Sequence, residues 1–428
     1  MLTKLRLKNF KNFQDAELHL GGFTLLVGTN AAGKSNIRDA MRFLHGIGRG
    51  YTLAEIIGGK FSEGGAPEWQ GIRGGANEIS FRKAKTFELG IDFTTGEEDQ
   101  QFKGHYEISV RIDPFGSRVL AESLIFEEYS QPIFKTGPFP TGTNNPEGQG
   151  LIAKFYDQRD IQFGISHPID SDRPLLAQFN SPKFFKEWGI MSSLPQQLIL
   201  MTTTLLADIR FPDLNSDEMR QPAIPGQKIL TDRGSNLSSV VQSISANPQR
   251  KAALLSWLGV LTPMDAKDFC FTPDVIGKVI LQFVESDGHL TSAFSASDGT
   301  LKFLGFLAAF LSPEPAKLLF LEELENGIHP TRLHLVLQLI EQQVKQQNIQ
   351  TIATTHSPNL LLHLDRQTLE NVSLVYRLPG KPDGEIRRIM DIPNIQKILE
   401  TQDLGRLEES GWFEDVMYFT ADDEAAAA

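Results

Sequence analysis

Gly28-Thr-Asn-Ala-Ala-Gly-Lys-Ser35 is the stretch of this sequence that decides the fold. Its spacing fits the phosphate loop, G-x-x-x-x-G-K-[ST]. A β-rich apolar run at residues 23–27 comes directly before it, and apolar residues recur at helical spacing over residues 37–44 directly after it. A strand, a glycine-rich loop and a helix in this order predict a site for the phosphates of a nucleoside triphosphate.

The chemistry of the loop gives each of its parts a task. Glycines let backbone N–H groups close around phosphate oxygens, and the N-terminus of the following helix adds partial positive charge. We expect Lys34 to neutralise the β- and γ-phosphates of ATP and the Ser35 hydroxyl to be a ligand of Mg²⁺. Asn30, Gly33 and Asn36 complete the predicted contacts with the nucleotide. The alternative, a chance glycine-rich turn, is disfavoured by the flanking strand and helix.

The composition is that of an ordinary globular protein. The 428 residues suffice for two or three domains, with 22% charged and 40% hydrophobic residues. The net charge of −12 argues against a surface that is basic all over, although a local basic groove remains compatible with it. Cys270 is the only cysteine, which excludes an internal disulfide and a cysteine-rich zinc site.

The sequence also argues against a membrane protein. The start of the chain is charged throughout and lacks the apolar core of a secretion signal. The longest apolar stretch, residues 303–311, is about half of what a membrane span needs. We therefore expect a cytoplasmic protein without membrane contact.

Residues 1–130 are predicted to form an N-terminal lobe in which an antiparallel sheet is inserted after the phosphate loop. Alternation of apolar and polar residues predicts strands at residues 2–10, 15–20, 77–82, 86–93, 106–112 and 119–126. The glycine-rich residues 46–75 are expected to be loop with little regular structure.

Residues 131–290 are predicted to be an insert of loops and helices. Residues 131–175 are rich in Pro, Gly, Asn and Thr, which favours a long surface loop. Helices are expected at residues 182–189, 194–210, 236–244 and 248–258, and a strand at residues 275–284. The seven prolines between residues 182 and 263 exclude a long coiled coil. Residues 291–428 are then a C-terminal lobe with a hairpin near residues 372–390.

The C-terminal lobe begins with a polar motif, Ser297-Asp-Gly-Thr300, which leads into an apolar helix through residue 311. A helix N-terminus that carries a hydroxyl and free N–H groups suits an anion. Taken alone, the motif is more typical of an ordinary N-cap.

Two further strands of this lobe end in chemically active side chains. Residues 317–321 predict a buried strand that is followed by Glu322 and Glu323, and residues 349–355 predict another that is followed by His356. Ligands of open α/β sheets bind at the carboxyl ends of the strands. One carboxylate could complete a Mg²⁺ shell while the other polarises a water for in-line attack on the γ-phosphate. The alternatives are a solvated acid pair and a structural histidine.

In this order the motifs resemble those of the ABC-type ATPase head, and more narrowly those of the RecF/SMC/OLD-like branch of the AAA family ATPases. The opening Leu5-Arg-Leu-Lys-Asn-Phe-Lys-Asn-Phe13 and the phrase Glu322-Glu-Leu-Glu-Asn-Gly-Ile-His-Pro330 carry the resemblance most specifically. It implies an α/β fold, an ABC-ATPase-like P-loop head with a mixed central sheet flanked by helices, an inserted antiparallel β subdomain and a helical subdomain.

The resemblance implies roles for the residues named above. Residues 28–35 correspond to the Walker A loop and Glu322-Glu323 to the Walker B pair, with Glu322 as a metal ligand and Glu323 as the catalytic base. His356 corresponds to the switch histidine that senses the γ-phosphate. Glu322 stands where Asp is commoner, so the metal shell is expected to differ.

The resemblance also implies a composite site between two copies of the chain. Ser297 and Gly299 lie in the signature motif, which in this family touches the γ-phosphate held by the opposite protomer. Two heads then sandwich two ATP molecules in a head-to-tail dimer or a higher oligomer. Asp298 stands where many relatives carry Gly, so we expect slower turnover or a compensating cation. Gln70 is the candidate for the Q-loop glutamine.

The domains that accompany ATPase heads in other members of this branch restrict the predicted function. The prolines exclude SMC- and Rad50-type coiled coils, and the roughly seventy residues after His356 are too few for the Toprim nuclease domain of OLD-type proteins. Asp170-Ser-Asp172, the one D-x-D spacing noted, lies in a proline-flanked loop that makes a poor nuclease site.

We therefore expect an ATPase subunit without nuclease chemistry of its own. It resembles the ATPase partners of two-gene phage-defence modules of the PARIS or abortive-infection type, in which an OLD-like head works with a separate Toprim-like nuclease or toxin. The alternative is a RecF-like DNA-repair clamp that grips duplex DNA when its heads close. A small-molecule kinase is disfavoured because it explains neither the paired acids nor the histidine strand.

Overall fold

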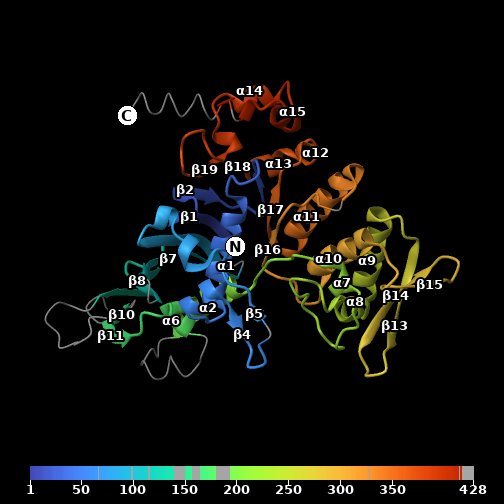
Figure 1. The fold of residues 1–428 in the computed structure, drawn as a ribbon, viewed down its shortest axis with the longest axis horizontal. Helices are drawn as coiled ribbons and strands as arrows, with labels where there is room; N and C mark the ends of the chain where they lie inside the picture. The colour runs from blue at the N-terminus through green and yellow to red at the C-terminus, as the bar shows by residue number, and fades with distance from the viewer. Residues whose placement is uncertain are drawn as a thin grey trace.

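A computed structural model describes residues 1–65, 67–97, 100–113, 116–138, 150–156, 164–179, 193–326, 328–413 and 415–416. Two sheets organise this part of the chain, and helix α1 (Lys34–Gly48) packs between them (Figure 1). The site discussed below lies at one edge of the smaller of these two sheets.

The central sheet has six strands in the order β12-β16-β17-β3-β18-β19. Its members are β3 (Phe23–Val27), β12 (Ile209–Arg210), β16 (Leu318–Leu321), β17 (Gln350–Thr355), β18 (Val372–Tyr376) and β19 (Glu385–Arg388). All neighbours are parallel except β18 and β19. Leu26 and Phe320 pack toward α1, whereas Leu25 and Leu321 pack toward the opposite face. Both faces are covered, which explains the continuous apolar runs of these strands.

The larger sheet is antiparallel, with eight strands in the order β11-β10-β9-β8-β7-β6-β1-β2. Its members are β1 (Leu2–Phe10), β2 (Phe13–His19), β6 (Thr86–Glu97), β7 (Gln100–Asp113), β8 (Gly116–Phe126), β9 (Phe134–Pro138), β10 (Leu151–Tyr156) and β11 (Gly164–Ile169). Helices α4 (Leu175–Gln178) and α6 (Ser193–Ala207) pack with α1 against it. Five of the six strands predicted before residue 130 are confirmed.

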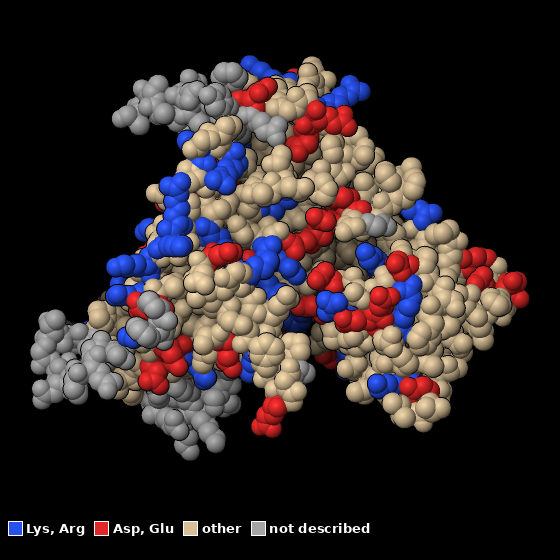
Figure 2. All heavy atoms as spheres, viewed as in Figure 1, with Lys and Arg blue, Asp and Glu red and all other residues tan. Residues whose placement is uncertain are grey.

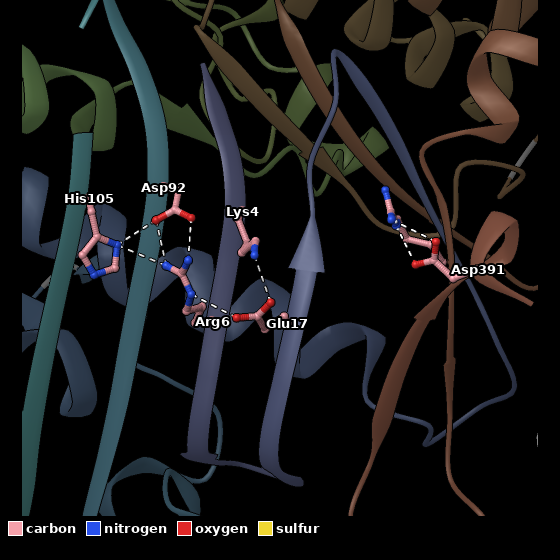
Figure 3. Close-up of polar contacts among 7 residues, drawn as sticks. Lys4, Arg6, Glu17, Asp92, His105 and Asp391 are labelled. Carbon is pink, nitrogen blue, oxygen red and sulfur yellow. Dashed lines mark hydrogen bonds and ion pairs between the residues drawn. The ribbon is translucent and has the colours of Figure 1, made fainter. Parts of the chain in front are cut away.

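Ion pairs between neighbouring strands lie on the outward face of this sheet (Figure 3). Arg6 on β1 binds both carboxylate oxygens of Asp92 on β6, at 2.7 and 2.6 Å. His105 Nδ1 lies 2.7 Å from the same carboxylate, and Lys4 pairs with Glu17 at 3.0 Å. These cross-strand pairs are typical of a solvated sheet face.

The long surface loop predicted at residues 131–175 is wrong, because three strands of the larger sheet lie there. In β10, Leu151, Ala153 and Phe155 are buried while the residues between them are not. The period of two was hidden by the Gly- and Pro-rich residues 139–149 and by residues 157–163, which lie outside the described residues.

Two smaller expectations for the first lobe also need correction. The strand predicted at residues 77–82 is wrong, because α3 (Gly75–Glu78) and a 3-10 turn (Phe81–Lys83) occupy this stretch. Gly74 and Gly75 have φ values of 72° and 54°, which turn the chain there. Residues 46–75 contain α2 (Leu53–Gly58), β4 (Lys60–Phe61) and β5 (Pro67–Trp69), and α2 begins with a Thr52–Glu55 capping box. The helix expected at residues 182–189 lies outside the described residues.

A helical subdomain occupies residues 211–311, between the adjacent strands β12 and β16, and forms the right-hand side of Figure 1. Its elements are α7 (Ser216–Met219), α8 (Leu237–Ser245), α9 (Pro248–Leu261), α10 (Asp298–Leu311), β13 (Ala266–Pro273), β14 (Val279–Glu285) and β15 (Leu290–Ser292). The helices predicted at residues 236–244 and 248–258 are confirmed, and β14 confirms the strand predicted at residues 275–284. Strands β13 and β15 were not predicted.

Helices that follow β16 pack around the central sheet, and the last described residues lie above it in Figure 1. These helices are α11 (Leu333–Gln347), α12 (Pro358–Leu361), α13 (Arg366–Leu369), α14 (Ile395–Leu399) and α15 (Leu404–Glu409), with 3-10 turns at Pro330–Arg332 and Ile389–Asp391. Strands β18 and β19 form the hairpin predicted near residues 372–390.

One buried side chain joins the two main sheets. Gln350, at the start of β17, donates to the carbonyl oxygens of Leu2 at 2.7 Å and Gly21 at 2.8 Å. Its Oε1 accepts a hydrogen bond of 2.8 Å from the backbone N–H of Leu2. The amide group thus bridges β1 and the segment that leads into β3.

The predicted fold class is confirmed. The phosphate loop sits on a mixed central sheet flanked by helices, and an antiparallel β subdomain and a helical subdomain accompany it. Within the described residues, the helices are all too short or too polar to cross a bilayer.

Candidate nucleotide-binding site

Three strand ends meet at one edge of the central sheet. Strand β17 lies between β3 and β16, all three are parallel, and Val27 is opposite Thr355. The phosphate loop follows β3, Glu322 follows β16 and His356 follows β17. Because parallel strands end at the same edge, these groups emerge into one region.

The phosphate loop is packed so closely that two of its glycines are required. A Cβ on Gly28 would lie 2.0 Å from the carbonyl oxygen of Val375, and a Cβ on Gly33 would lie 2.6 Å from Asn12 Nδ2. Gly33 also has a φ of 126°. The first N–H groups of α1 have no partner within the helix, so they are available to an anion. A glycine cradle at a helix N-terminus fits phosphate oxygens.

Lys34 begins α1 and is almost fully buried. Its Nζ donates to the carbonyl oxygens of Thr29, at 3.1 Å, and Gly28. Burial lowers the pKa of Lys34, and the carboxylates of Glu325, Glu408 and Glu323 oppose this shift. Lys34 thus lies within electrostatic reach of two acids that follow β16, Glu323 and Glu325.

The start of α1 is held from the β1–β2 turn and from the segment after β5. Asn36, a predicted nucleotide contact, donates its side-chain amide to Asn12 Oδ1 at 2.7 Å, and Asn12 donates to Ala32 O at 2.8 Å. The carbonyl oxygen of the half-buried Ser35 accepts from Arg73. These contacts fix the loop, and Asn36 therefore has a supporting role in the structure.

The predicted Mg²⁺ ligands are Ser35 and Glu322. One carboxylate oxygen of Glu322 forms an ion pair with Arg38 on α1, at 2.9 Å. The described residues contain no group of three or more His, Cys, Asp or Glu side chains that could hold a metal. The hydroxyl of Ser35 and the carboxylate of Glu322 are oxygen donors of the kind that Mg²⁺ takes, with phosphates and water as its usual further ligands.

Glu323, the predicted catalytic base, is held in an unusual backbone conformation. Its φ is 48°, and its backbone N–H donates to Thr354 Oγ1 at 2.9 Å. The side chain is 3.5 Å from the Asn326 amide nitrogen. A non-glycine residue in the left-handed region costs about 1–3 kcal/mol and is found mainly at functional sites. The prediction for Glu323 remains a prediction.

His356 is paired with an acid that the sequence analysis did not select. Glu325 Oε1 accepts from the backbone N–H of His356 at 3.0 Å and lies 3.1 Å from His356 Nδ1. The other oxygen, Oε2, is buried and has no hydrogen-bond partner in the described part of the chain. His356 is half exposed at the sheet edge, where the prediction placed it.

Ser297 and Gly299 lie at the N-terminus of α10. Ser297 is the N-cap, with its hydroxyl accepting from Thr300 N–H at 3.2 Å. Asp298 pairs with Arg220 at 2.6 Å, which supplies the compensating cation that was expected. Helix α10 packs on the sheet face opposite to α1. Contact of the signature residues with a partner's phosphate stays a prediction.

The remaining predicted residues lie at the periphery. Asn30 is exposed at the tip of the phosphate loop. Gln70 follows β5 with an exposed side chain, and its carbonyl oxygen accepts from Arg42 of α1 at 2.8 Å. Its Q-loop role stays a prediction.

Sequence reasoning missed Glu325, Arg38 and Arg220. Glu325 had a signal, since it is the third acid of Glu322-Glu-Leu-Glu325. Arg38 lies one helical turn after Lys34, so helix geometry could have placed it near the same edge. Arg220 had no signal, because it reaches Asp298 from a distant segment.

Comparison with known proteins gives the family. Residues 23–362 match the family described as "AAA domain, putative AbiEii toxin, Type IV TA system". The chain belongs to this AAA family. The matched region includes the phosphate loop, the acid pair and His356, whereas β18, β19, α14 and α15 follow it.

Individual relatives of this AAA family chain are distant. It is 23% identical over 377 residues to an ATP/GTP phosphatase of Helicobacter pylori, covering 86% of this chain and 88% of that protein. It is 52% identical over 46 residues to the chromosome partition protein Smc of Methanocaldococcus jannaschii, covering 10% of this chain and 4% of that protein.

Two solved structures show a likeness at 14% identity. The SMC head domain from Thermotoga maritima has a TM-score of 0.40 and covers 90% of this chain and 98% of that one. An SmcHead bound to the C-winged helix domain of ScpA has a TM-score of 0.48 and covers 90% and 97%.

Proposed function

We propose that this chain binds ATP with Mg²⁺ at the edge of the central sheet and hydrolyses it. The observation that carries the proposal is the parallel order β16-β17-β3, in which Glu323, His356 and the loop with Lys34 follow neighbouring strand ends and Glu323 lies within electrostatic reach of Lys34. The ATP/GTP phosphatase of Helicobacter pylori, matched over most of both chains, supports hydrolysis as the reaction.

Each residue has a task in the proposed reaction. Lys34 binds the β- and γ-phosphates through its ammonium group, and backbone N–H groups at the N-terminus of α1 also bind the phosphates. Glu323 accepts a proton from the water that attacks the γ-phosphorus, while the bond to the β–γ bridging oxygen breaks. His356 contacts the γ-phosphate and orients it. Bound Mg²⁺ supplies charge neutralisation, and Ser35 and Glu322 would hold it.

We further propose that two copies close head-to-tail around ATP and that this cycle controls a separate effector, a Toprim-like nuclease or a toxin, in phage defence. The dimer is supported by Ser297, which caps a helix on the sheet face opposite to α1. A γ-phosphate that favours the closed dimer would bias a two-state assembly. The abortive-infection connection in the family description supports the defence role.

A pair of variants tests the site and the dimer together. Lys34→Ala should lose ATP binding in a fluorescent-nucleotide assay, because the loop loses its cation. Glu323→Gln should bind ATP but hydrolyse it roughly 100-fold more slowly or worse. With ATP and Mg²⁺ it should accumulate as a species of twice the monomer mass in light scattering.

Glu314→Gln is the matched control, since Glu314 is an exposed acid that pairs with Lys228. Lys34→Ala binding ATP as well as the wild type would refute the site. A molecular mass of the Glu323→Gln protein that stays the same with and without ATP would refute the composite dimer. Co-purification with the product of the neighbouring gene tests the effector role.

A second candidate, an SMC- or RecF-like DNA-binding ATPase, is favoured by two observations. The 46-residue match is to a chromosome partition protein. Lys and Arg side chains gather on the flank over β1, β2 and β19 in Figure 2, and Arg82, Arg377 and Lys381 line an open groove beside β18. DNA-stimulated hydrolysis, with DNA affinity that falls steeply with salt, would favour this candidate.

A further inference from the structure

The loop after β16 is fastened to the end of β17 by a series of short contacts. The backbone N–H groups of Glu323 and Leu324 donate to Thr354, at 2.9 Å to Oγ1 and 3.0 Å to the carbonyl oxygen. Glu325 then spans the same gap with its side chain and reaches the backbone N–H and the ring Nδ1 of His356, at 3.0 and 3.1 Å.

The position of Glu325 is unusual for a loop acid. Its side chain is only 13% exposed, whereas His356 opposite is 46% exposed. Burying a carboxylate is costly unless it is paired and hydrogen-bonded. One oxygen has two donors from His356 and the other, Oε2, has none among the described residues. The hydrogen-bonded oxygen of this carboxylate thus contacts His356 and not the loop that carries Glu325.

We propose that Glu325 is the positioning residue of His356 in the hydrolysis proposed above, on which this inference rests. A carboxylate can only accept, so the Nδ1 atom that faces it carries the proton. This fixes the ring orientation and leaves Nε2 for the γ-phosphate, to which it donates when the ring carries a proton on both nitrogens. The bond to the backbone N–H of His356 fixes the residue that carries the ring.

Glu325 differs in this role from Glu322 and Glu323. Glu322 is held by Arg38, and Glu323 is aligned by Thr354. The turn that carries His356 also has separate support, because Ser357 N–H donates to Thr355 Oγ1 at 3.0 Å. Loss of the Glu325 charge should therefore release the ring without unfolding the turn.

A double-mutant cycle with Glu325→Gln and His356→Gln tests the proposal. Each single variant should lower kcat by about 10- to 100-fold and leave the Kd for ATP within about threefold, because a misplaced group affects the reaction more than binding. The double variant should be no slower than the worse single variant by more than about threefold, since residues that act as a unit are not additive.

Glu370→Gln, an exposed acid that ends α13, is the matched control and should keep the wild-type kcat. Effects of Glu325→Gln and His356→Gln that multiply would overturn the proposal, as would a Glu325→Gln kcat within about twofold of the wild type. If Glu325→Gln melts far below the wild type, Glu325→Asp in the wild-type and His356→Gln backgrounds gives the same cycle. A wild type that does not hydrolyse ATP would instead refute the proposed function.

Discussion

Arg220 compensates the negative charge of Asp298, a residue that the sequence analysis identified as unfavourable for binding a triphosphate. Asp298 places a negative charge beside the helix N-terminus where an ATP phosphate of a partner is proposed to bind. Arg220 pairs with that carboxylate at 2.6 Å and also donates to the carbonyl oxygen of Ala296 at 2.9 Å. The guanidinium is 19% exposed and the carboxylate 69% exposed, so the pair presents its acidic side outward.

Arg220→Gln should therefore weaken ATP-driven assembly, because it leaves the Asp298 charge uncompensated. We expect the ATP concentration for half-maximal assembly of the Glu323→Gln protein to rise by about three- to tenfold at low salt. Adding Asp298→Asn should restore it. Lys228→Gln, which removes an exposed partner of Glu314, serves as the control. Equal assembly with and without Arg220 would contradict this account.

At the residue scale, the sequence predicted the positions of Lys34, Glu323 and His356 because each follows a strand whose pattern is plain. It could not predict which carboxylate contacts which cation. One such pair is Arg38 with Glu322, which lie hundreds of residues apart in the sequence, and the other is Glu325 with His356 on the next strand. The geometry of both pairs is set by tertiary packing.

Among the elements, α4 packs on the larger sheet and is also hydrogen-bonded to it through a buried acid. Glu122 on β8 accepts from the backbone N–H groups of Leu175 at 2.5 Å and Leu176 at 2.9 Å, and from Tyr106 Oη at 2.9 Å. Burial raises the pKa of Glu122 to about 7, although these three hydrogen bonds oppose the rise. The anchor of α4 is consequently sensitive to pH.

The sign of this sensitivity follows from the raised pKa. Between the ordinary value of 4.5 and about 7, the folded state binds more protons than the unfolded state. The free energy of unfolding therefore falls as pH rises through this window, by about 3 kcal/mol in total from this group. Urea unfolding at pH 5 and pH 8 should show this loss in the wild type and not in Glu122→Gln.

Glu107→Gln on the neighbouring strand β7 is the control for this comparison, since its side chain is half exposed. It should retain the wild-type dependence. A Glu122→Gln protein that loses as much stability as the wild type between these pH values would show that Glu122 is ionised in both states.

Element prediction succeeded where one period ran without interruption and failed where loops broke it. The apolar strands β3, β16 and β17 and the alternating strands β6 to β8 were found from pattern alone. Strands β9 to β11 are short, a Gly- and Pro-rich segment separates the first two, and the three are held by pairing with β8 and with one another. Such pairing is a tertiary property that composition does not reveal.

Across the whole molecule, α15 near the end of the described residues lies beside the phosphate loop near the start of the chain. Glu408 on α15 and Phe413 line a cavity with Gly28 and Thr29 of the phosphate loop. Gly405 lies so close to α12 that a Cβ would be 2.6 Å from the carbonyl oxygen of Pro358. This segment therefore sits against both the phosphate loop and the helix that follows His356.

Glu408→Gln should tighten ATP binding, because it removes a negative charge near the triphosphate. We expect a two- to fivefold lower Kd, roughly, at low salt and a smaller change at high salt. Glu409→Gln, the exposed neighbouring residue, is the control. Calorimetric titration at two salt concentrations measures the effect, and an unchanged or higher Kd would place Glu408 outside the field of the phosphates.

Gln350 has a consequence for how such a molecule can move. Three hydrogen bonds of 2.7 to 2.8 Å at one buried amide connect the two main sheets. The chain enters the helical subdomain after β12 and leaves it before β16, and the subdomain also packs against one face of the central sheet. We expect any motion of this subdomain on ATP binding to turn about these two chain connections, beside the strand that carries the acid pair.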